Sequence, residues 1–77
     1  MKIEVLGTGC TKCRALEAAT RRAADRVGVD YTLDHVTDIN KITEYGVMMT
    51  PALVIDGQVK SVGALPSETD LEAMLRA

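Results

Sequence analysis

The feature that most constrains this chain of 77 residues is a pair of cysteines, Cys10 and Cys13, placed where the hydrophobic period changes. Before the pair, apolar and polar residues alternate over Met1–Val5, and the composition of Lys2–Leu6 predicts a strand that the following Gly-Thr-Gly ends. After it, apolar residues recur every three or four positions, which predicts a helix over about Thr11–Val27. The cysteines therefore lie in a loop that joins a strand to a helix.

Further strands and helices follow from the hydrophobic period and from turn residues. They are a strand in which Val29, Tyr31 and Leu33 alternate with polar residues, a helix capped by Thr37 or Asp38 and ended by Gly46, strands over Ala52–Ile55 and Gln58–Val62, and a helix over Ser67–Arg76. Asp56-Gly57 favours a two-residue hairpin turn between the last two strands. Ser67 and Asp70 have the spacing of a helix cap.

The resulting order, β-α-β-α-β-β-α, predicts an α/β fold with a four-stranded mixed sheet and helices on both faces. A helix between the first two strands makes them parallel through a right-handed crossover, and the hairpin makes the last two antiparallel. We expect the first strand to be central, with the cysteine loop at its carboxyl end. The length corresponds to a single domain over residues 1–77.

Composition narrows the class of function. A net charge of −2 and an aromatic content of 3% argue against a nucleic-acid partner, which would select a basic face and stacking rings. No apolar run reaches the roughly 20 residues of a membrane span, and the first residues lack the apolar stretch of a signal peptide. Both cysteines lie in one loop, unlike those of a disulfide-stapled secreted domain. We therefore expect a cytoplasmic monomer with no membrane partner.

The position of the cysteines favours thiol–disulfide chemistry. Cys10 falls at the predicted helix N-cap, where unpaired amides and the helix dipole favour its thiolate, and Lys12 adds positive charge. Cys13 lies one turn later on the apolar face, placed to resolve a mixed disulfide by attacking Cys10. Residues three apart at a helix start can form a disulfide. Since the Cys10–Cys13 pair itself stores both electrons, this chemistry requires no bound cofactor.

Metal binding is the alternative that the cysteines leave open. A structural zinc site needs four ligands, and besides carboxylates only His35 could join the cysteines. The segment Gly7-Thr8-Gly9-Cys10 is similar to the loop of soft-metal, Cu(I)-binding modules of the heavy-metal-associated type, although their element order ends in a strand rather than a helix. An iron–sulfur carrier that uses Cys10 between two subunits is a third possibility.

Three segments carry a resemblance to a known family: Gly9-Cys10-Thr11-Lys12-Cys13, Met49-Thr50-Pro51 and Val62-Gly63-Ala64-Leu65. With the element order, they resemble the thioredoxin/glutaredoxin superfamily over essentially the whole chain. Within it, the chain is similar to the small prokaryotic thioredoxin-like proteins of the redox-active disulfide protein 2 group. The resemblance implies a minimal thioredoxin-like fold. It also implies a thiol–disulfide oxidoreductase that acts on protein disulfides and receives electrons from a thioredoxin-reductase-like or other donor.

The resemblance also implies a substrate-binding surface beside the cysteines. The Thr50–Pro51 peptide bond would be cis, and the Thr50 backbone would pair with an extended segment of the target protein. A single glycine, Gly63, stands where glutaredoxins use two to bind glutathione, which is more thioredoxin-like. Besides Thr50 and Pro51, the residues implied to contact substrate are Gly9, Thr11, Met49 and Gly63.

Glu4 lies six residues before Cys10, which is the offset of the buried acid in thioredoxins. The resemblance implies that its carboxylate takes the proton of Cys13 if burial raises its affinity for that proton. The alternative is that Lys2 and Glu4 share a solvated face of the strand.

Met48 and Met49 directly precede the residues of the predicted cis bond. Because methionine is flexible and polarizable, it adapts to varied apolar partners. We expect one of the two to enter the core and the other to be exposed near Cys10, where it would contact the target.

Overall fold

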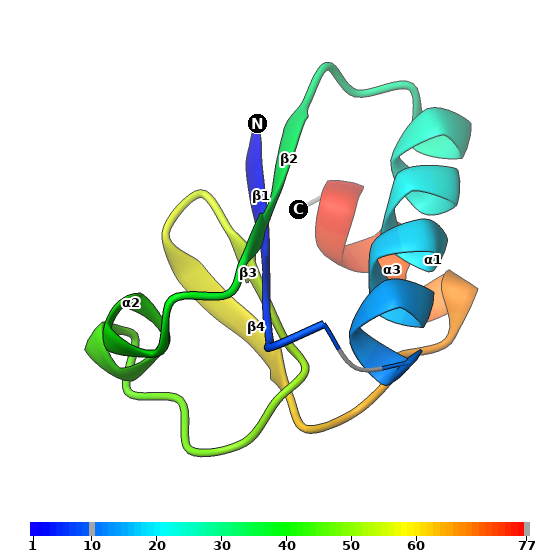
Figure 1. Ribbon diagram of the computed structural model, residues 1–77. Helices are drawn as coiled ribbons and strands as arrows, with labels where there is room; N and C mark the ends of the chain where they lie inside the picture. Colours follow the sequence, from blue (N-terminus) through cyan, green and yellow to red (C-terminus); the bar gives the residue numbers. More distant parts are fainter. Residues whose placement is uncertain (10, 77) are drawn as a thin grey trace.

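The computed structural model describes residues 1–9 and 11–76 of the chain and shows an α/β fold (Figure 1). Over these residues the elements are β1 (Lys2–Leu6), α1 (Thr11–Val27), β2 (Thr32–Val36), α2 (Ile39–Glu44), β3 (Ala52–Ile55), β4 (Gln58–Val62) and α3 (Glu68–Arg76). This order confirms the predicted fold class. Within the described ranges, no helix has the length and hydrophobicity that crossing a bilayer requires.

The strands form a mixed sheet in the order β2-β1-β3-β4. β1 runs parallel to β2 and antiparallel to β3, and β3 and β4 form an antiparallel hairpin. The turn residues Asp56 and Gly57 both have positive φ, 50° and 82°, as a tight hairpin turn demands. The predicted central position of β1 is therefore confirmed, and its carboxyl end leads into the cysteine loop.

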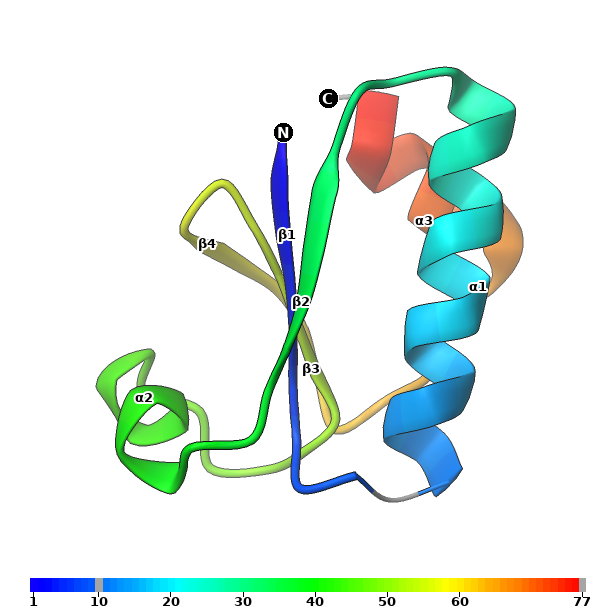
Figure 2. The same ribbon diagram turned by 45° about the horizontal axis from the view of Figure 1, so that its top comes forward.

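One face of the sheet is covered by α1 and α3, which lie side by side (Figures 1 and 2). The helix α1 is amphipathic because its small and aliphatic residues recur at helical spacing. Its buried residues are Cys13, Leu16, Ala19, Thr20, Ala23 and Ala24. They pack with Ile3 and Val5 of β1 and with Leu71 and Leu75 of α3 into the main aliphatic cluster. The Thr20 hydroxyl is satisfied within this core by donating a 2.7 Å hydrogen bond to the carbonyl of Leu16.

The other face carries only the short helix α2 among the described elements (Figure 2). Of the two predicted caps, Asp38 is the one used, and its carboxylate accepts a 2.9 Å hydrogen bond from the amide of Asn40. The helix ends at Glu44, Tyr45 is its C-cap, and Gly46 follows with φ of 74°. A second, smaller apolar cluster lies under it and consists of Leu6, Ile42, Val47, Ala52 and Val54.

The start of the second strand differs from the prediction. β2 begins at Thr32, three residues later than the alternation from Val29 suggested. Val29 and Tyr31 are half-buried because they pack against the main cluster, so their alternation with polar residues reflects this packing and not pairing in the sheet. The ladder itself begins where Thr32 lies opposite Lys2, the first residue of β1. β2 is an edge strand that pairs with β1, so its ladder starts where β1 starts.

The last helix begins one residue after the predicted start. Ser67 lies outside α3 and caps it, since its hydroxyl accepts a 3.2 Å hydrogen bond from the amide of Asp70. The spacing of these two residues therefore predicted the helix start correctly, but Ser67 is the N-cap rather than a residue of the first turn.

Candidate functional site

The end of β1, the first turn of α1 and the segment before β3 come together at one end of the sheet. Cys13 is fully buried in the first turn of α1, as its place on the apolar face predicted. The predicted nucleophile, Cys10, lies outside the described residues. Its position at the helix N-cap and its role therefore stay predictions.

Gly7 allows the Cys13 sulfur to pack directly against the end of β1. A Cβ atom at Gly7 would overlap Cys13 Sγ and would lie 3.7 Å from Thr50 Cβ. The φ angle of Gly7 is not in the left-handed region, so the close approach, rather than the backbone conformation, requires glycine here. The structure thus brings the buried cysteine, Gly7 and Thr50 together.

The Thr50–Pro51 peptide bond is cis, the isomer that the resemblance implied. Pro51 is buried, and its carbonyl accepts a 2.8 Å hydrogen bond from the amide of Gly63, the residue after β4. Thr50 is exposed. This arrangement fixes the segment before β3 to the end of β4 and presents Thr50 to solvent beside Gly7.

An exposed apolar surface surrounds Gly63. The side chain of Met49 lies over this glycine, so that a Cβ placed there would be 3.3 Å from both Met49 Cβ and Met49 Cε. Met48 and Met49 are 93% and 63% exposed, and Val62 and Leu65 on either side of Gly63 are exposed as well. We call Met48, Met49, Val62 and Leu65 the apolar rim.

The expectation that one of the two methionines is buried is wrong, because both belong to the apolar rim. Val47 takes the core position of this segment instead and is 7% exposed in the smaller apolar cluster. A hydrophobic run of three residues shows that one side chain is buried without showing which one.

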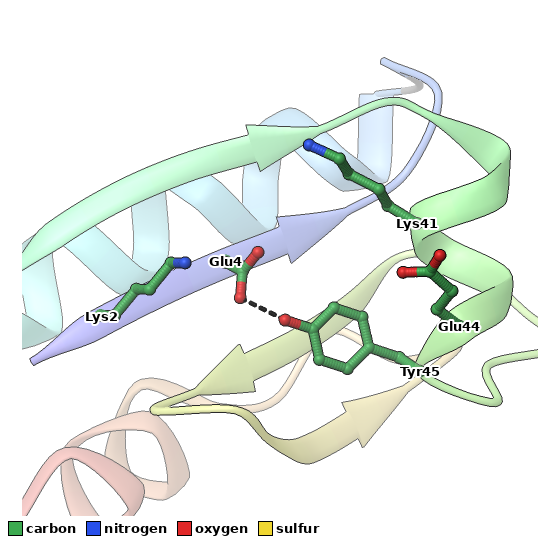
Figure 3. Close-up of a pocket in the computed structure, with 5 residues that line it drawn as sticks. All are labelled: Lys2, Glu4, Lys41, Glu44 and Tyr45. Carbon is green, nitrogen blue, oxygen red and sulfur yellow. Dashed lines mark hydrogen bonds between the residues drawn. The ribbon is translucent and has the colours of Figure 1, made fainter.

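Glu4 is buried, but its carboxylate turns toward α2 (Figure 3). The hydroxyl of Tyr45 donates a 2.5 Å hydrogen bond to Glu4 Oε1. This hydrogen bond, together with burial and the negative charges of Glu4 and Glu44, raises the pKa of Tyr45 above its usual value. The pair lines an open pocket of about 410 Å³, whose lining residues are Lys2, Glu4, Lys41, Glu44 and Tyr45.

Glu4 and Cys13 therefore lie toward opposite faces of the sheet. Side chains alternate along a strand, and Leu6, two residues after Glu4, belongs to the cluster under α2. Cys13 belongs to α1 on the other face. The structure brings Glu4 to Tyr45, and its proposed proton transfer with Cys13 stays a prediction. The alternative, a wholly solvated face, fits Lys2, which is exposed, but not Glu4.

The remaining predicted site residues flank the cysteine loop. Gly9 is half-buried with φ of 90°, a conformation that favours glycine. Thr11 and Lys12 are exposed in the first turn of α1. Among residues 1–9 and 11–76, no three metal-ligating side chains gather. The metal alternatives depend on Cys10 and are not tested by this arrangement.

The element order, the mixed sheet with β1 at its centre, and the buried Cys13 beside Gly7 and Thr50 are those of a thioredoxin-like class of protein. The sequence matches the profile of the thioredoxin domain family over residues 1–76. A thioredoxin of Methanothermobacter thermautotrophicus is 33% identical over 75 residues, which are 97% of each chain. A thioredoxin of Methanocaldococcus jannaschii is 32% identical over 75 residues, covering 97% of this chain and 86% of the relative.

The chain belongs to the thioredoxin domain family. This membership supports a thioredoxin-like redox function and confirms the family resemblance inferred from the sequence.

Two residues of the site and its surroundings were not found from the sequence. Gly7 continues the alternation of Ile3 and Val5, which face α1, and that signal could have placed it against the cysteine helix. Tyr45 follows Ile42 at helical spacing, but nothing in the sequence indicates that its hydroxyl reaches Glu4, 41 residues away.

Proposed function

We propose that this protein is a thiol–disulfide oxidoreductase that exchanges its Cys10–Cys13 dithiol with disulfides of other proteins. The observation that carries the proposal is the buried Cys13 sulfur, packed against Gly7 with exposed Thr50 alongside. A cysteine buried at the start of a helix, beside the exposed residue Thr50, suits a thiol that acts from within the protein. The family membership supports the same class of chemistry.

The proposed exchange proceeds in two steps. The Cys10 thiolate attacks one sulfur of the target disulfide, so that a mixed disulfide forms and the other target sulfur leaves as a thiolate. Cys13 then loses its proton and attacks Cys10 Sγ, which breaks the mixed disulfide and releases the second target thiolate. The target gains two electrons, and the Cys10–Cys13 disulfide forms. No bound cofactor takes part.

The burial of Cys13 supports the assignment of Cys10 as the attacking cysteine and Cys13 as the resolving cysteine. A thiol that is 0% exposed does not reach the disulfide of a separate folded protein, whereas it is available to a neighbour three residues away. Lys12 is exposed in the same helical turn, and its charge favours a thiolate at the helix start. Glu4 remains a candidate for the proton of Cys13, although its observed partner is Tyr45.

Target docking is proposed along the segment before β3. Thr50 is exposed, while Pro51 is buried and its carbonyl accepts a hydrogen bond from Gly63, so Thr50 is the residue proposed to pair with an extended target segment. Met49 supplies apolar contact over Gly63, and Gly9 and Thr11 border the cysteine loop. The oxidised protein is then returned to the dithiol by an electron donor of the thioredoxin-reductase type.

Trapping of the mixed disulfide tests the proposal. The Cys13→Ser variant, mixed with insulin, is expected to accumulate a covalent adduct through Cys10 that dithiothreitol dissolves. The matched Cys10→Ser variant is expected to form none, because its remaining thiol is buried. Mass spectrometry of non-reduced samples measures both. If each single variant reduces insulin disulfides as fast as the wild-type protein, the proposed exchange is wrong.

A further inference from the structure

The four methionines of the chain fall into two environments. Met48 and Met49 are 93% and 63% exposed, next to the cis-proline segment. Met1 and Met74 are half-buried and pack against the main aliphatic cluster. Oxidants in solution reach a thioether in proportion to its exposure. The protein therefore carries two exposed methionine residues at the proposed docking surface, and the half-buried pair, Met1 and Met74, supplies an internal reference for them.

We propose that Met48 and Met49 form a modification site at which hydrogen peroxide reversibly lowers the affinity for protein targets. This inference rests on the proposed function and adds its regulation. In the reaction, a lone pair of Met Sδ attacks one peroxide oxygen, the O–O bond breaks, and an S–O bond forms. The sulfur loses two electrons and becomes a sulfoxide, while the peroxide is reduced to one molecule of water.

The position of Met49 links the modification to docking. Its Sδ lies 3.6 Å from the place that a Cβ of Gly63 would occupy, and it is the residue next to Thr50. We therefore expect a target segment that pairs with Thr50 to contact the Met49 side chain. A sulfoxide there carries a strongly hydrogen-bonding oxygen in place of an apolar sulfur, and that oxygen must give up water when the target docks.

Cys13 is not part of this switch. Cys13 is fully buried whereas Met48 and Met49 are exposed, and the cysteine pair can be held as the disulfide while peroxide is present. Under these conditions, peroxide oxidises the methionines and leaves the cysteine pair unchanged. Loss of target affinity with an unchanged capacity for thiol exchange distinguishes this switch from damage to the cysteines.

The experiment starts from the full-length protein in its Cys10–Cys13 disulfide form, treated with dilute hydrogen peroxide. Peptide mass spectrometry is expected to find one added oxygen on Met48 and on Met49 well before Met1 and Met74. After removal of peroxide and reduction with dithiothreitol, insulin reduction is expected to show KM raised about five-fold or more, with a smaller change in kcat. Treatment with methionine sulfoxide reductase is expected to restore KM.

Two variants give the matched comparison. Met48→Leu/Met49→Leu conserves volume but holds no oxidisable sulfur at the rim, and its KM is expected to be the same before and after peroxide. Met74→Leu is expected to respond to peroxide as the wild-type protein does. Equal oxidation rates for all four methionines, or an oxidised wild-type protein with unchanged KM, would overturn this inference and leave the proposed function standing. If the untreated protein does not reduce insulin, the proposed function fails and this inference fails with it.

Discussion

The two faces of the sheet hold their helices by different means. On the face covered by α1 and α3, the packing is aliphatic, and the buried hydroxyl of Thr20 bonds within its own helix. On the face covered by α2, the apolar cluster is smaller and borders an open pocket with the Glu4–Tyr45 pair. The helix that carries Cys13 thus rests on the larger core, while the buried carboxylate lies toward the other face. The comparison teaches that aliphatic packing, rather than a neighbouring charge, positions the sulfur.

The largest expected change in the free energy of unfolding comes from truncating a buried leucine, and one leucine on each face of the sheet gives the comparison. Leu53 belongs to the main cluster and Leu6 to the cluster under α2, and both are 0% exposed. Truncation of a buried leucine to alanine costs about 2–5 kcal/mol of unfolding free energy, depending on how far the site collapses. We expect Leu53→Ala near the upper end and Leu6→Ala near the lower, because the six-residue helix α2 can shift to fill the space. Urea unfolding measures both, and equal losses would remove the proposed difference between the faces.

The next effect tests the close approach of Cys13 to β1. Gly7→Ala places a methyl group where the Cys13 sulfur lies, so either the helix or the strand end must move. We expect a loss of about 1–3 kcal/mol in urea unfolding, as for other overpacked sites, together with slower insulin reduction. Thr8→Ala, at the exposed neighbour, is the matched control and is expected to change neither. A Gly7→Ala protein with wild-type stability and rate would contradict the described packing.

On the face covered by α2, we expect a smaller loss of unfolding free energy when the Glu4–Tyr45 hydrogen bond is removed. Tyr45→Phe removes the donor to the buried carboxylate of Glu4. Loss of a partner by a buried acceptor costs about 1–3 kcal/mol, and we expect the lower end because the pocket is open to water. Glu4→Gln keeps an oxygen that accepts the hydrogen bond and is expected to be milder. If Glu4→Gln instead slows the resolution of the mixed disulfide while Tyr45→Phe does not, Glu4 takes the proton of Cys13, as predicted from the sequence.

The same pair gives a pH dependence. Because the pKa of Tyr45 is raised in the folded protein, its contribution to stability is fully present below the usual value of 10.0 and is lost as pH rises through the folded pKa. Wild-type stability should therefore fall more steeply than that of Tyr45→Phe above about pH 10. Parallel curves in urea unfolding at stepped pH would show that the hydroxyl does not interact with Glu4.

The smallest effect concerns the surface between α1 and α3. Glu68 accepts contacts of 3.1 Å from Arg22 and 3.2 Å from Arg26, which lower its pKa below the usual 4.5. This contribution is present above pH 4.5 and is lost as pH falls through the folded pKa. We expect Glu68→Gln to lower the urea midpoint slightly at low salt and to match the wild-type protein in high salt, since exposed ion pairs are screened. A large loss at low salt that disappears in high salt would mean that these ion pairs, rather than apolar packing, hold the two helices together.

Local signals in the sequence were sufficient for most of the fold. The strand composition of Lys2–Leu6, the helical period of α1 and the Asp56-Gly57 turn each depend on neighbouring residues, and each was predicted at its observed place. The start of β2 was missed because the length of a strand depends on its partner, which is distant in sequence. The period of an amphipathic helix also placed Cys13 correctly in the core.

The surroundings of the site were less predictable. Whether Val47, Met48 or Met49 enters the core depends on the three-dimensional path of a non-helical, non-strand segment, which no period describes. The direction of Glu4 follows from strand alternation, but its partner does not, because Tyr45 comes from a different element. Contacts between distant elements therefore set the surroundings of the Glu4 carboxylate, while a local pattern was sufficient to place Cys13 in the core.

A redox titration tests the central claim most directly. The wild-type protein is equilibrated with stepped ratios of reduced and oxidised dithiothreitol, alkylated, and weighed by mass spectrometry to count the thiols. We predict one two-electron transition in which Cys10 and Cys13 change together, with a potential between about −200 and −270 mV. Two thiols that are alkylated independently of each other, with no shared transition at any ratio, would contradict the account.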